Sequence, residues 1–506
     1  MKAYRTLRAA LLAGAAIACV GGVAHAQETS EERIARLESA LQELQGQLAD
    51  LKASTAASVA QVRSTQQATT VTLANGRPAI SSGDGQFTAN FRGVFQLDGG
   101  IYDQDDAGPA TTDFRRGSFG DAAEADRARD LSDGANFRRV RIGIEGKAFG
   151  DFEYNFLYDF GGSGTEEGGK ISAAWLQYNG LGFAKIRVGA FPPPTGLEDA
   201  ASNATSLFSE RASIAETVRS ISGGDGRTGI GLYSNGERWT AAGVLTGNVI
   251  GTSTYDEQVG FVGRVTYVPY KRENSLIHLG ANANLVLTPA ANRLDVAGGT
   301  GPLSPIRLRD RPEFRVDGTR LVDTGNIDAD GLTALGAEFG AQYKNFYVQA
   351  EYFDIDLERR ASAFSDPSFS GWYVQGSWIL TGQSRRYNAA GGFDGPRVEK
   401  PFSLKNGTWG AWELGLRYST IDLNHDENEL PALGGIRGGE QDIFSVGLNW
   451  YLNNAVLVQA TYRNVSVDRT STGAANAYGT GVFTPAIGEQ VGQDLNIYSL
   501  RTQYAF

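Results

Sequence analysis

The feature that most constrains the fold is an alternation of apolar and polar residues that runs from Gln86 to the end of the chain. In DFEYNFLYDF (151–160), for example, aromatic residues hold every second position and Glu, Asn or Asp fill most of the positions between them. Alternation of this kind favours a strand whose two faces meet different environments. Sixteen such segments are predicted, and they begin near residues 86, 136, 151, 170, 183, 227, 238, 257, 275, 331, 345, 369, 408, 440, 454 and 493.

Short turns and long polar loops alternate between the predicted strands, apart from one connection, about 383–407, that is long on the side of the short turns. Outer-membrane barrels have short turns on one side and longer loops on the other, with aromatic girdles on the lipid face. A soluble sandwich is disfavoured because its buried faces are mainly aliphatic. The predicted fold is therefore all-β: a sixteen-stranded antiparallel transmembrane β-barrel over residues 86–506, preceded by a short coiled-coil helix.

The first 26 residues have the layout of an export signal. Three cations precede a short apolar core, and AHA (24–26) fits the small-x-small cleavage pattern. Cys19 allows a lipoprotein reading, but the residues before it fit that pattern poorly. Cleavage after Ala26 removes three cations, so the net charge changes from −11 to −14, and it also removes the only cysteine. We predict a signal peptide over 1–26 and the bacterial outer membrane as the location.

A heptad pattern follows in residues 27–53. Its apolar positions have the 3–4 spacing of a coiled-coil seam and are Ile34, Leu37, Leu41, Leu44, Leu48 and Leu51. The pattern predicts a self-associating helix, with a single amphipathic helix or a tether to the cell wall as alternatives. Residues 54–85, rich in Ser, Thr, Ala and Gln, are predicted to be a linker.

Cations gather on the polar face of ANFRRVRIGIEGKAFGD (135–151). An Arg or Lys that faces the middle of the bilayer costs about 2–4 kcal/mol, whereas a residue that faces the lumen avoids this cost. We therefore expect the charged face of this strand to line a water-filled pore.

Seven short stretches, in this order along more than 300 residues, resemble the phosphate-selective porin O and P family. They are FRR (137–139), GLE (196–198), SER (209–211), RLRDR (307–311), LTG (380–382), GAWELGLRYS (410–419) and GLNWY (447–451). The resemblance implies a homotrimeric sixteen-stranded outer-membrane channel in which two long loops fold into the lumen and arginines lead anions to a constriction. It also implies that assembly machinery recognises the aromatic C-terminal strand, which ends here at Phe506.

The resemblance assigns anion-binding roles to seven arginines. Two belong to the second strand, one to an inward loop at about 192–226, three to a second inward loop at about 289–330, and one to the first strand. They are Arg138, Arg139, Arg211, Arg307, Arg309, Arg311 and Arg92. Guanidinium groups suit this role because they bind phosphate oxygens in a bidentate manner. The alternative is that they pair with acids of the loops or lumen, and for Arg315 and Arg320 both interpretations stay open.

Three positions depart from the family pattern. Asp199 stands where a lysine is expected, Ser172 where a constriction aspartate is expected, and Val94 where a first-strand arginine is expected, although Arg92 is close by with the same parity. The predicted function is passive diffusion of anions, phosphate or related oxyanions. The alternative is a general diffusion porin with little anion selectivity, which the acidic net charge and Asp199 favour.

No catalytic arrangement emerges from the sequence. After signal cleavage the histidines are His278, in a predicted strand, and His425, in an acidic loop. A Ser-His-Asp arrangement or a cluster of Cys and His ligands for a metal is not apparent. We expect no enzyme activity, no cofactor, no metal and no nucleic-acid partner. The expected partners are outer-membrane lipid and lipopolysaccharide, which the acidic loops could contact through divalent cations.

Overall fold

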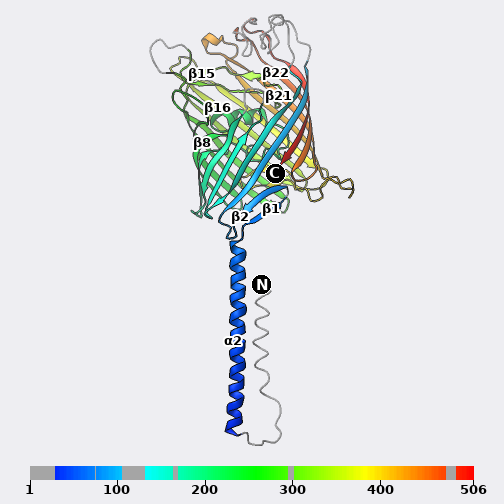
Figure 1. Cartoon of the computed structure of the whole chain (residues 1–506). Helices are drawn as coiled ribbons and strands as arrows, with labels where there is room; N and C mark the ends of the chain where they lie inside the picture. The colour runs from blue at the N-terminus through cyan, green and yellow to red at the C-terminus, as the bar shows by residue number, and fades with distance from the viewer. Residues whose placement is uncertain (1–28, 75, 105–130, 163–168, 294–300, 474–485) are drawn as a thin grey trace. The chain divides into compact units, whose positions relative to one another are not determined.

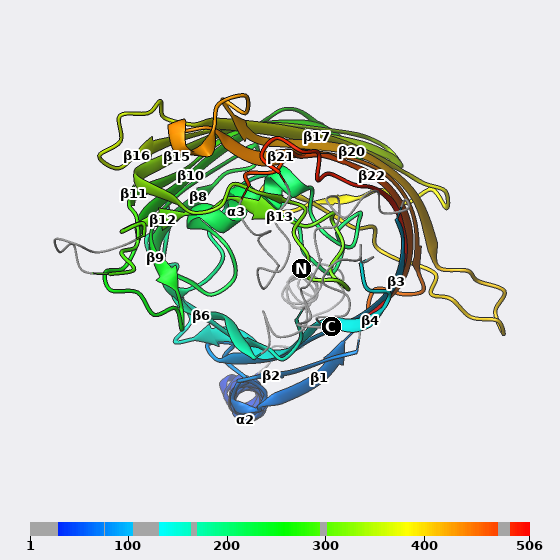
Figure 2. The same cartoon turned by 90° about the horizontal axis from the view of Figure 1, so that it is seen from above.

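The computed structural model describes residues 29–74, 76–104, 131–162, 169–293, 301–473 and 486–506. The predicted signal peptide lies outside these residues. Sixteen antiparallel strands form the closed wall of a barrel, each paired with the next, and the last strand pairs with the first. Figure 2 shows the strands as a ring. The predicted sixteen-stranded barrel is confirmed.

The wall strands, in chain order, are β3 (Thr88–Gln104), β4 (Gly134–Ala148), β5 (Phe152–Asp159), β6 (Lys170–Tyr178), β7 (Lys185–Ala190), β8 (Arg227–Asn235), β9 (Trp239–Val249), β10 (Val259–Arg272), β11 (Ser275–Thr288), β15 (Ile327–Tyr343), β16 (Phe346–Arg359), β17 (Ser368–Ile379), β20 (Ala411–His425), β21 (Ile436–Tyr451), β22 (Val456–Asp468) and β23 (Asp494–Ala505). A 3₁₀ helix, η2 (Pro431–Leu433), precedes β21.

The two faces of the wall differ as the alternation predicts. In β20 the outward side chain of Leu416 is 50% exposed, whereas its neighbour Arg417 points inward and is 1% exposed. Ile142 on β4 is likewise exposed, and Arg141 beside it is buried. The outward face therefore offers apolar surface to lipid, and the charged side chains lie inside the barrel.

Three connections fold into the barrel. Residues 191–226 contain α3 (Ser213–Ser222), and residues 289–326 contain β12 (Pro305–Ile306), β13 (Arg309–Asp310) and β14 (Val322–Asp323). Figure 2 shows α3 and β13 inside the ring of strands. The third connection, 380–410, contains β18 (Arg386–Tyr387) and β19 (Phe393–Asp394) and comes from the side of the short turns. Within it, Ala390 and Gly391 accept hydrogen bonds from the buried guanidinium of Arg264.

The inward segments bring a hydrophobic core into the barrel. Ile214 and Val218 of α3 pack in one cluster with Leu308, Phe314 and Leu321, all almost fully buried. The inward face of the strands is thus covered by protein over much of its area. Arg417, on the inward face of β20, is buried because the loops supply side chains that contact it, among them Glu198 and Glu313.

The N-terminal unit is one helix, α2 (Ser30–Gln67), which begins with a capping box between Thr29 and Glu32. The helix includes residues 54–67 of the predicted linker (54–85). The later part of that linker contains a hairpin of two strands, β1 (Thr70–Ala74) and β2 (Arg77–Ser81). Strand β2 pairs with residues 88–90 of β3. None of the described helices is long and apolar enough to cross a membrane.

Candidate functional site

A β-bulge turns two successive arginines into the barrel. In the pairing of β3 with β4, Gln96 lies opposite Arg139 and Leu97 lies opposite Phe137, so Arg138 is an extra residue. Neighbouring strand residues normally point to opposite faces, but a bulge breaks this rule at one position. Arg138 and Arg139 are both buried inside, 6% and 4% exposed, while Phe137 is 53% exposed outside.

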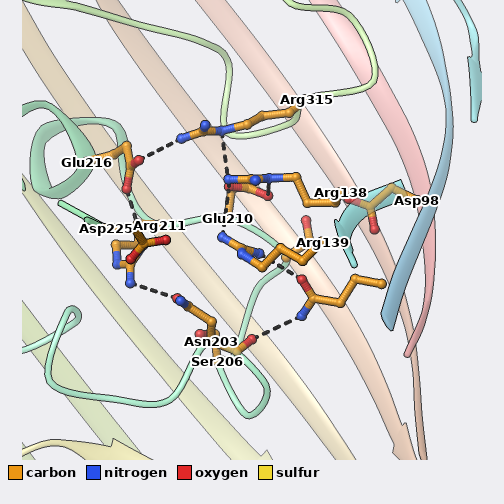
Figure 3. A network of polar contacts seen from close by, with 12 residues as sticks. Asp98, Arg138, Arg139, Asn203, Ser206, Glu210, Arg211, Glu216, Asp225 and Arg315 are labelled. Atoms are coloured by element: carbon orange, nitrogen blue, oxygen red, sulfur yellow. Dashed lines mark hydrogen bonds and ion pairs between the residues drawn. The ribbon is translucent and has the colours of Figure 1, made fainter. Parts of the chain in front are cut away.

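Glu210, from the inward loop 191–226, is the centre of the arginine cluster (Figure 3). Its carboxylate accepts two hydrogen bonds from Arg138, from Nε at 2.7 Å and from Nη2 at 3.1 Å. Arg315 Nε lies 3.2 Å from Glu210 Oε2, and Arg501 Nη2 lies 3.2 Å from Oε1. Arg139 Nη2 is more distant, at 3.9 Å. One carboxylate therefore fixes arginines from two strands and a second loop.

The pairs continue from Glu210 into one connected network. Arg315 leads to Glu216 at 2.7 Å, Arg211 joins Glu216 to Asp199, and Arg219 joins Asp199 to Asp225. Figure 3 shows part of this chain of contacts. Among the described residues the members are seven arginines and six carboxylates: Arg138, Arg139, Arg141, Arg211, Arg219, Arg315, Arg501, Asp98, Asp159, Asp199, Glu210, Glu216 and Asp225.

Two loop carboxylates of this network, Glu210 and Glu216, stay ionised at neutral pH. Burial alone would raise the pKa of Glu210, but the charges of Arg138 and Arg315 outweigh burial and hold this pKa well below its usual range. Burial and nearby arginines compete at Glu216 too, and Arg315 makes the largest contribution that lowers its pKa, which is about 2. These two carboxylates therefore keep their negative charge over the physiological pH range.

A second buried cluster joins other stretches that carry the family resemblance. Arg417, from GAWELGLRYS, contacts Glu198, from GLE, and donates to Glu313 Oε2 at 2.9 Å. Glu210, from SER, binds Arg138, from FRR, in the same way. Motifs that are far apart in the sequence thus meet as arginine–carboxylate pairs, which hold the inward loops against the wall.

The predicted anion-binding arginines of the loops all have protein partners. Arg211 pairs with Asp199 at 2.8 Å, and Arg307 binds Asp323 with two hydrogen bonds of 2.7 and 2.5 Å. Arg311 Nε donates to the Gly318 carbonyl at 3.1 Å, and Arg309 is in β13, opposite Asp323 of β14. The structure brings Arg138, Arg139 and Arg211 into one network and places the other loop arginines beside it.

The first strand contributes less than predicted to this network. Arg92 pairs with Glu145 of β4 at 2.9 Å, and Arg77 of β2 binds the same carboxylate at 2.6 Å. Val94, at the position of the expected arginine, is buried and apolar. Arg92 is thus part of a separate ion-pair group, formed with Glu145 and Arg77, and lies outside the contacts that surround Glu210.

Several members of the network were not among the predicted anion-binding residues. Arg141 belongs to the charged face of 135–151 that was expected to line the pore, but no anion-binding role was assigned to it. Arg501 has the inward parity of the last strand, so alternation alone could have found it. Arg219 has no such signal because it lies in helix α3. It matters for Asp199, whose carboxylate it holds at 2.7 Å together with Arg211. The acid that replaces the expected lysine is therefore neutralised by two arginines.

Arg139 has the least complete set of partners in the cluster. Its Nη1 donates to Gln96 Oε1 at 2.8 Å, but its buried Nε has no hydrogen-bond partner among the described residues. Gln96 is itself held by Gln503 of the last strand and by the Asn203 carbonyl of the loop. An incompletely paired guanidinium next to a carboxylate that four arginines share is a place where a further anion would gain hydrogen bonds.

Comparison with known proteins identifies the family of the chain. The sequence model of the family described as phosphate-selective porin O and P matches residues 113–506. The chain is 27% identical to Porin O of Pseudomonas aeruginosa over 375 residues, which cover 70% of this chain and 82% of that protein.

Two solved structures are similar at low identity. An anion-selective porin from Comamonas acidovorans has a TM-score of 0.46 and 12% identity, covering 83% of this chain and 100% of that one. The outer-membrane channel DcaP of Acinetobacter baumannii has a TM-score of 0.43 and 13% identity, covering 83% and 97%. The family match extends over most of the barrel, and this chain belongs to the phosphate-selective porin O and P family, as an anion-selective porin of the bacterial outer membrane.

Proposed function

We propose that the barrel passes phosphate and related oxyanions passively, along the arginines that its bulge and its inward loops bring together. The observation that carries this proposal is the inward pair Arg138 and Arg139, with the Nε of Arg139 left without a hydrogen-bond partner among the described residues. Arg139 is the residue that we expect to contact a passing anion most directly.

Arg211, Arg307, Arg309, Arg311 and Arg92 are proposed to act with this pair in spite of their protein partners. A guanidinium group has five N–H donors, and a bidentate carboxylate uses two of them. The remaining donors can bind an oxyanion as it passes, while the carboxylate holds the side chain in place. A pore wall of low dielectric constant also focuses the field of such groups on the lumen.

The runner-up is a general diffusion porin with little preference for anions. The near balance of seven arginines and six carboxylates favours this alternative, as does the net charge of −14 that is expected after signal cleavage. The two functions differ in the reversal potential of the channel, because only a selective pore draws this potential toward that of chloride.

The test is the reversal potential of the purified protein in a planar bilayer under a KCl gradient, with and without phosphate. We expect a reversal near the chloride potential and a block of the current by phosphate. Arg138→Ala with Arg139→Ala should lower the anion preference, whereas the exposed turn variant Arg238→Ala should leave it unchanged. A wild-type reversal near zero without phosphate block would favour the general porin.

We infer that the chain carries out no catalysis. His278, the candidate for a barrel lipase, is fully buried and contacts Tyr387 Oη at 2.7 Å and Glu338 Oε2 at 3.1 Å rather than a serine. Over the described residues, no group of three His, Cys, Asp or Glu side chains could hold a metal ion. Phospholipid hydrolysis by the wild-type protein that His278→Ala abolishes would contradict this inference.

The assembly is proposed to be a homotrimer held in part by the N-terminal helix. The six heptad residues Ile34 to Leu51 are each more than half exposed in the single chain, which supports a helical partner for this seam. Export by the signal peptide, contact with lipopolysaccharide and recognition of the strand that ends at Phe506 by assembly machinery complete the proposal.

A further inference from the structure

Arg187, on β7, is an inward cation whose surroundings differ from those of the network. Its Nε and Nη2 donate to Gln177 Oε1 at 3.0 and 2.8 Å. Its Cζ lies 4.2 Å from the centroid of the Trp175 ring and 4.7 Å from that of Tyr233. No carboxylate lies within 4.0 Å of this guanidinium in the described parts of the chain, so the group is held by neutral partners and keeps its full charge.

The strand pairing explains why the aromatic rings reach this arginine. Gln177 is directly opposite Arg187, and on the other side Gly231 is opposite it. A Cβ on Gly231 would come within 2.8 Å of the Tyr233 ring. The glycine therefore leaves the space in which the Tyr233 ring lies over the guanidinium, and cation–π contacts of this kind position a cation without neutralising it.

Arg187 lines a cavity of about 260 Å³ between β5–β10 and the inward connection 380–410. At about 30 Å³ for each water, this volume would hold roughly eight waters. Lys185 and Arg264 also line it, and Glu153 is its one acid among the described residues. Arg264 is fully occupied by Glu338 and by carbonyls.

Glu153 acts on Arg187 through its charge but makes no direct ion pair with it. Gln177 lies between the two groups, because its Nε2 donates to Glu153 Oε2 at 3.1 Å while its Oε1 accepts from Arg187. The cavity therefore keeps a surplus of positive charge from Arg187 and Lys185.

A second donor in the cavity is the hydroxyl of Tyr233. Its oxygen lies beside the Arg187 guanidinium and can accept from it, but its own O–H has no acceptor among the described residues. A buried O–H without an acceptor costs free energy unless a ligand or water accepts from it. The hydroxyl, the Nη1 edge of Arg187 and the ammonium group of Lys185 come from adjacent inward positions of β7 and β8.

The rest of the lining combines the polar residues Ser234, Asn235 and Thr240 with small apolar ones. Ala241 and Ala242 come from β9, Ala389 and Ala390 from the inward connection, and Pro194 from the loop 191–226. The apolar side chains cannot form hydrogen bonds to the oxygens of a free phosphate. They suit a ligand with one charged end and a compact apolar body, since burial of apolar surface contributes about 25 cal/mol per Å².

We propose that this cavity is a second anion site, separate from the Glu210 cluster, and that it takes a small organic carboxylate whose charged group meets Arg187, Tyr233 and Lys185. The site rests on the proposed function in one respect, since the carboxylate must enter the lumen through the same anion path. It extends the substrate class from inorganic oxyanions to carboxylic acids of the size of benzoate.

The experiment measures how benzoate, acetate and phosphate block the chloride current of single channels in a planar bilayer. We expect benzoate to block the wild-type protein at a lower concentration than acetate. Arg187→Gln should raise the half-blocking concentration of benzoate about tenfold or more, as expected for a charge-assisted hydrogen bond, and leave phosphate block within about twofold. The exposed variant Arg238→Gln, in the turn after β8, is the matched control.

Tyr233→Phe keeps the ring over Arg187 and removes only the hydroxyl, so it tests the site even if Arg187→Gln fails to fold. We expect it to weaken benzoate block about threefold. The proposal is overturned if benzoate does not block the wild-type channel, or if both variants leave its block unchanged. It is also overturned if Arg187→Gln weakens phosphate and benzoate block equally. A wild-type channel without anion preference that benzoate still blocks through Arg187 would contradict the proposed function and support this site.

Discussion

At the scale of single residues, four of the arginines that the family resemblance singles out, Arg138, Arg211, Arg307 and Arg92, bind carboxylates of the same chain. Glu210 illustrates the consequence, because it holds Arg138 with two hydrogen bonds and lies beside Arg315 and Arg501. The negative charge of Glu210 opposes the passage of anions, yet the same carboxylate holds these arginines in position. The selectivity of such a pore depends on how the arginines and carboxylates are balanced along the path rather than on the number of arginines.

Replacing Glu210 should therefore change selectivity and stability in opposite directions. Glu210→Gln removes the shared negative charge, and one charge at about 4 Å in water is worth about 1 kcal/mol, so the anion-to-cation permeability ratio should rise about fivefold. The same change leaves buried arginines without their partner and should destabilise the barrel by about 3–5 kcal/mol. Bilayer recordings and urea unfolding measure the two effects.

Glu237→Gln, in the exposed turn after β8, is the matched control for Glu210→Gln and should change neither quantity. An unchanged permeability ratio in Glu210→Gln would mean that anions do not pass near this cluster.

Asp310, in the inward loop 289–326, predicts a pH effect. Burial raises its pKa to about 7, from about 3.9 in the unfolded chain. The folded loop therefore binds this proton more tightly than the unfolded chain does, and its stability falls as the pH rises from about 4 to about 7 and is level above that. We expect the loop to be cleaved faster by added protease at pH 8 than at pH 5.

Asp310→Asn should abolish this difference between pH 5 and pH 8, while Asp426→Asn, on the exposed surface, should retain it. If the difference persists in Asp310→Asn, another group governs the loop.

At the scale of elements, the strands were predictable and the course of the loops was not. Alternation is a local property, so all sixteen strands could be located from neighbouring residues. The bulge at Arg138 breaks the alternation at one position and is visible only in the pairing with β3. The contacts of the inward loops join residues that are far apart in sequence, such as Glu198 and Arg417. A local sequence pattern does not predict such contacts.

The helix boundary shows a different limit of sequence reasoning. Residues 54–67 are rich in Ser, Thr, Ala and Gln, a composition that suggests a linker, yet α2 continues to Gln67. This stretch contains neither glycine nor proline, and alanine has the highest helix propensity of all residues. A helix that has already been nucleated can extend through such residues at low cost, since propagation is easier than initiation.

The exposed heptad seam of α2 predicts an association that the barrel does not need in order to fold. Changing Leu41, Leu44 and Leu48 to Ser should convert the trimer to monomers in detergent while the barrel keeps its resistance to heat and SDS, because each buried Leu side chain contributes about 1.5–3 kcal/mol. Light scattering measures the mass. Changing the polar residues Gln42, Gln45 and Gln47 to Ser is the control, and a trimer that survives the leucine changes would assign assembly to the barrel wall.

At the scale of the whole molecule, the chain is acidic, yet it gathers arginines inside the barrel. The net charge is −11, whereas the connected network holds seven arginines with six carboxylates among the described residues. Exposed charges are screened over a Debye length that falls from about 10 Å at 0.1 M salt to about 3 Å at 1 M, and buried groups are screened much less. The two sources of selectivity are therefore distinguishable by their response to salt.

We expect the preference for anions to persist, within about twofold, when the mean KCl concentration rises from 0.1 M to 1 M at a fixed gradient. Surface acids would shift the selectivity strongly at low salt and little at high salt. Reversal potentials at the two concentrations measure this directly. A preference that disappears at 1 M would assign selectivity to the outer surface and favour the general porin.

The closure of the barrel at β3 and β23 also determines an order of events in time. Phe506, the last residue, exchanges two backbone hydrogen bonds with Gly93. Arg501, a few residues before it, binds Asp98 across the same closure with two hydrogen bonds of 2.6 Å and also reaches Glu210. The wall therefore closes only when β23 pairs with β3, and the same pairing brings Arg501 to Asp98 and Glu210. We expect a chain without its final strand to lose both the closed barrel and these ion pairs.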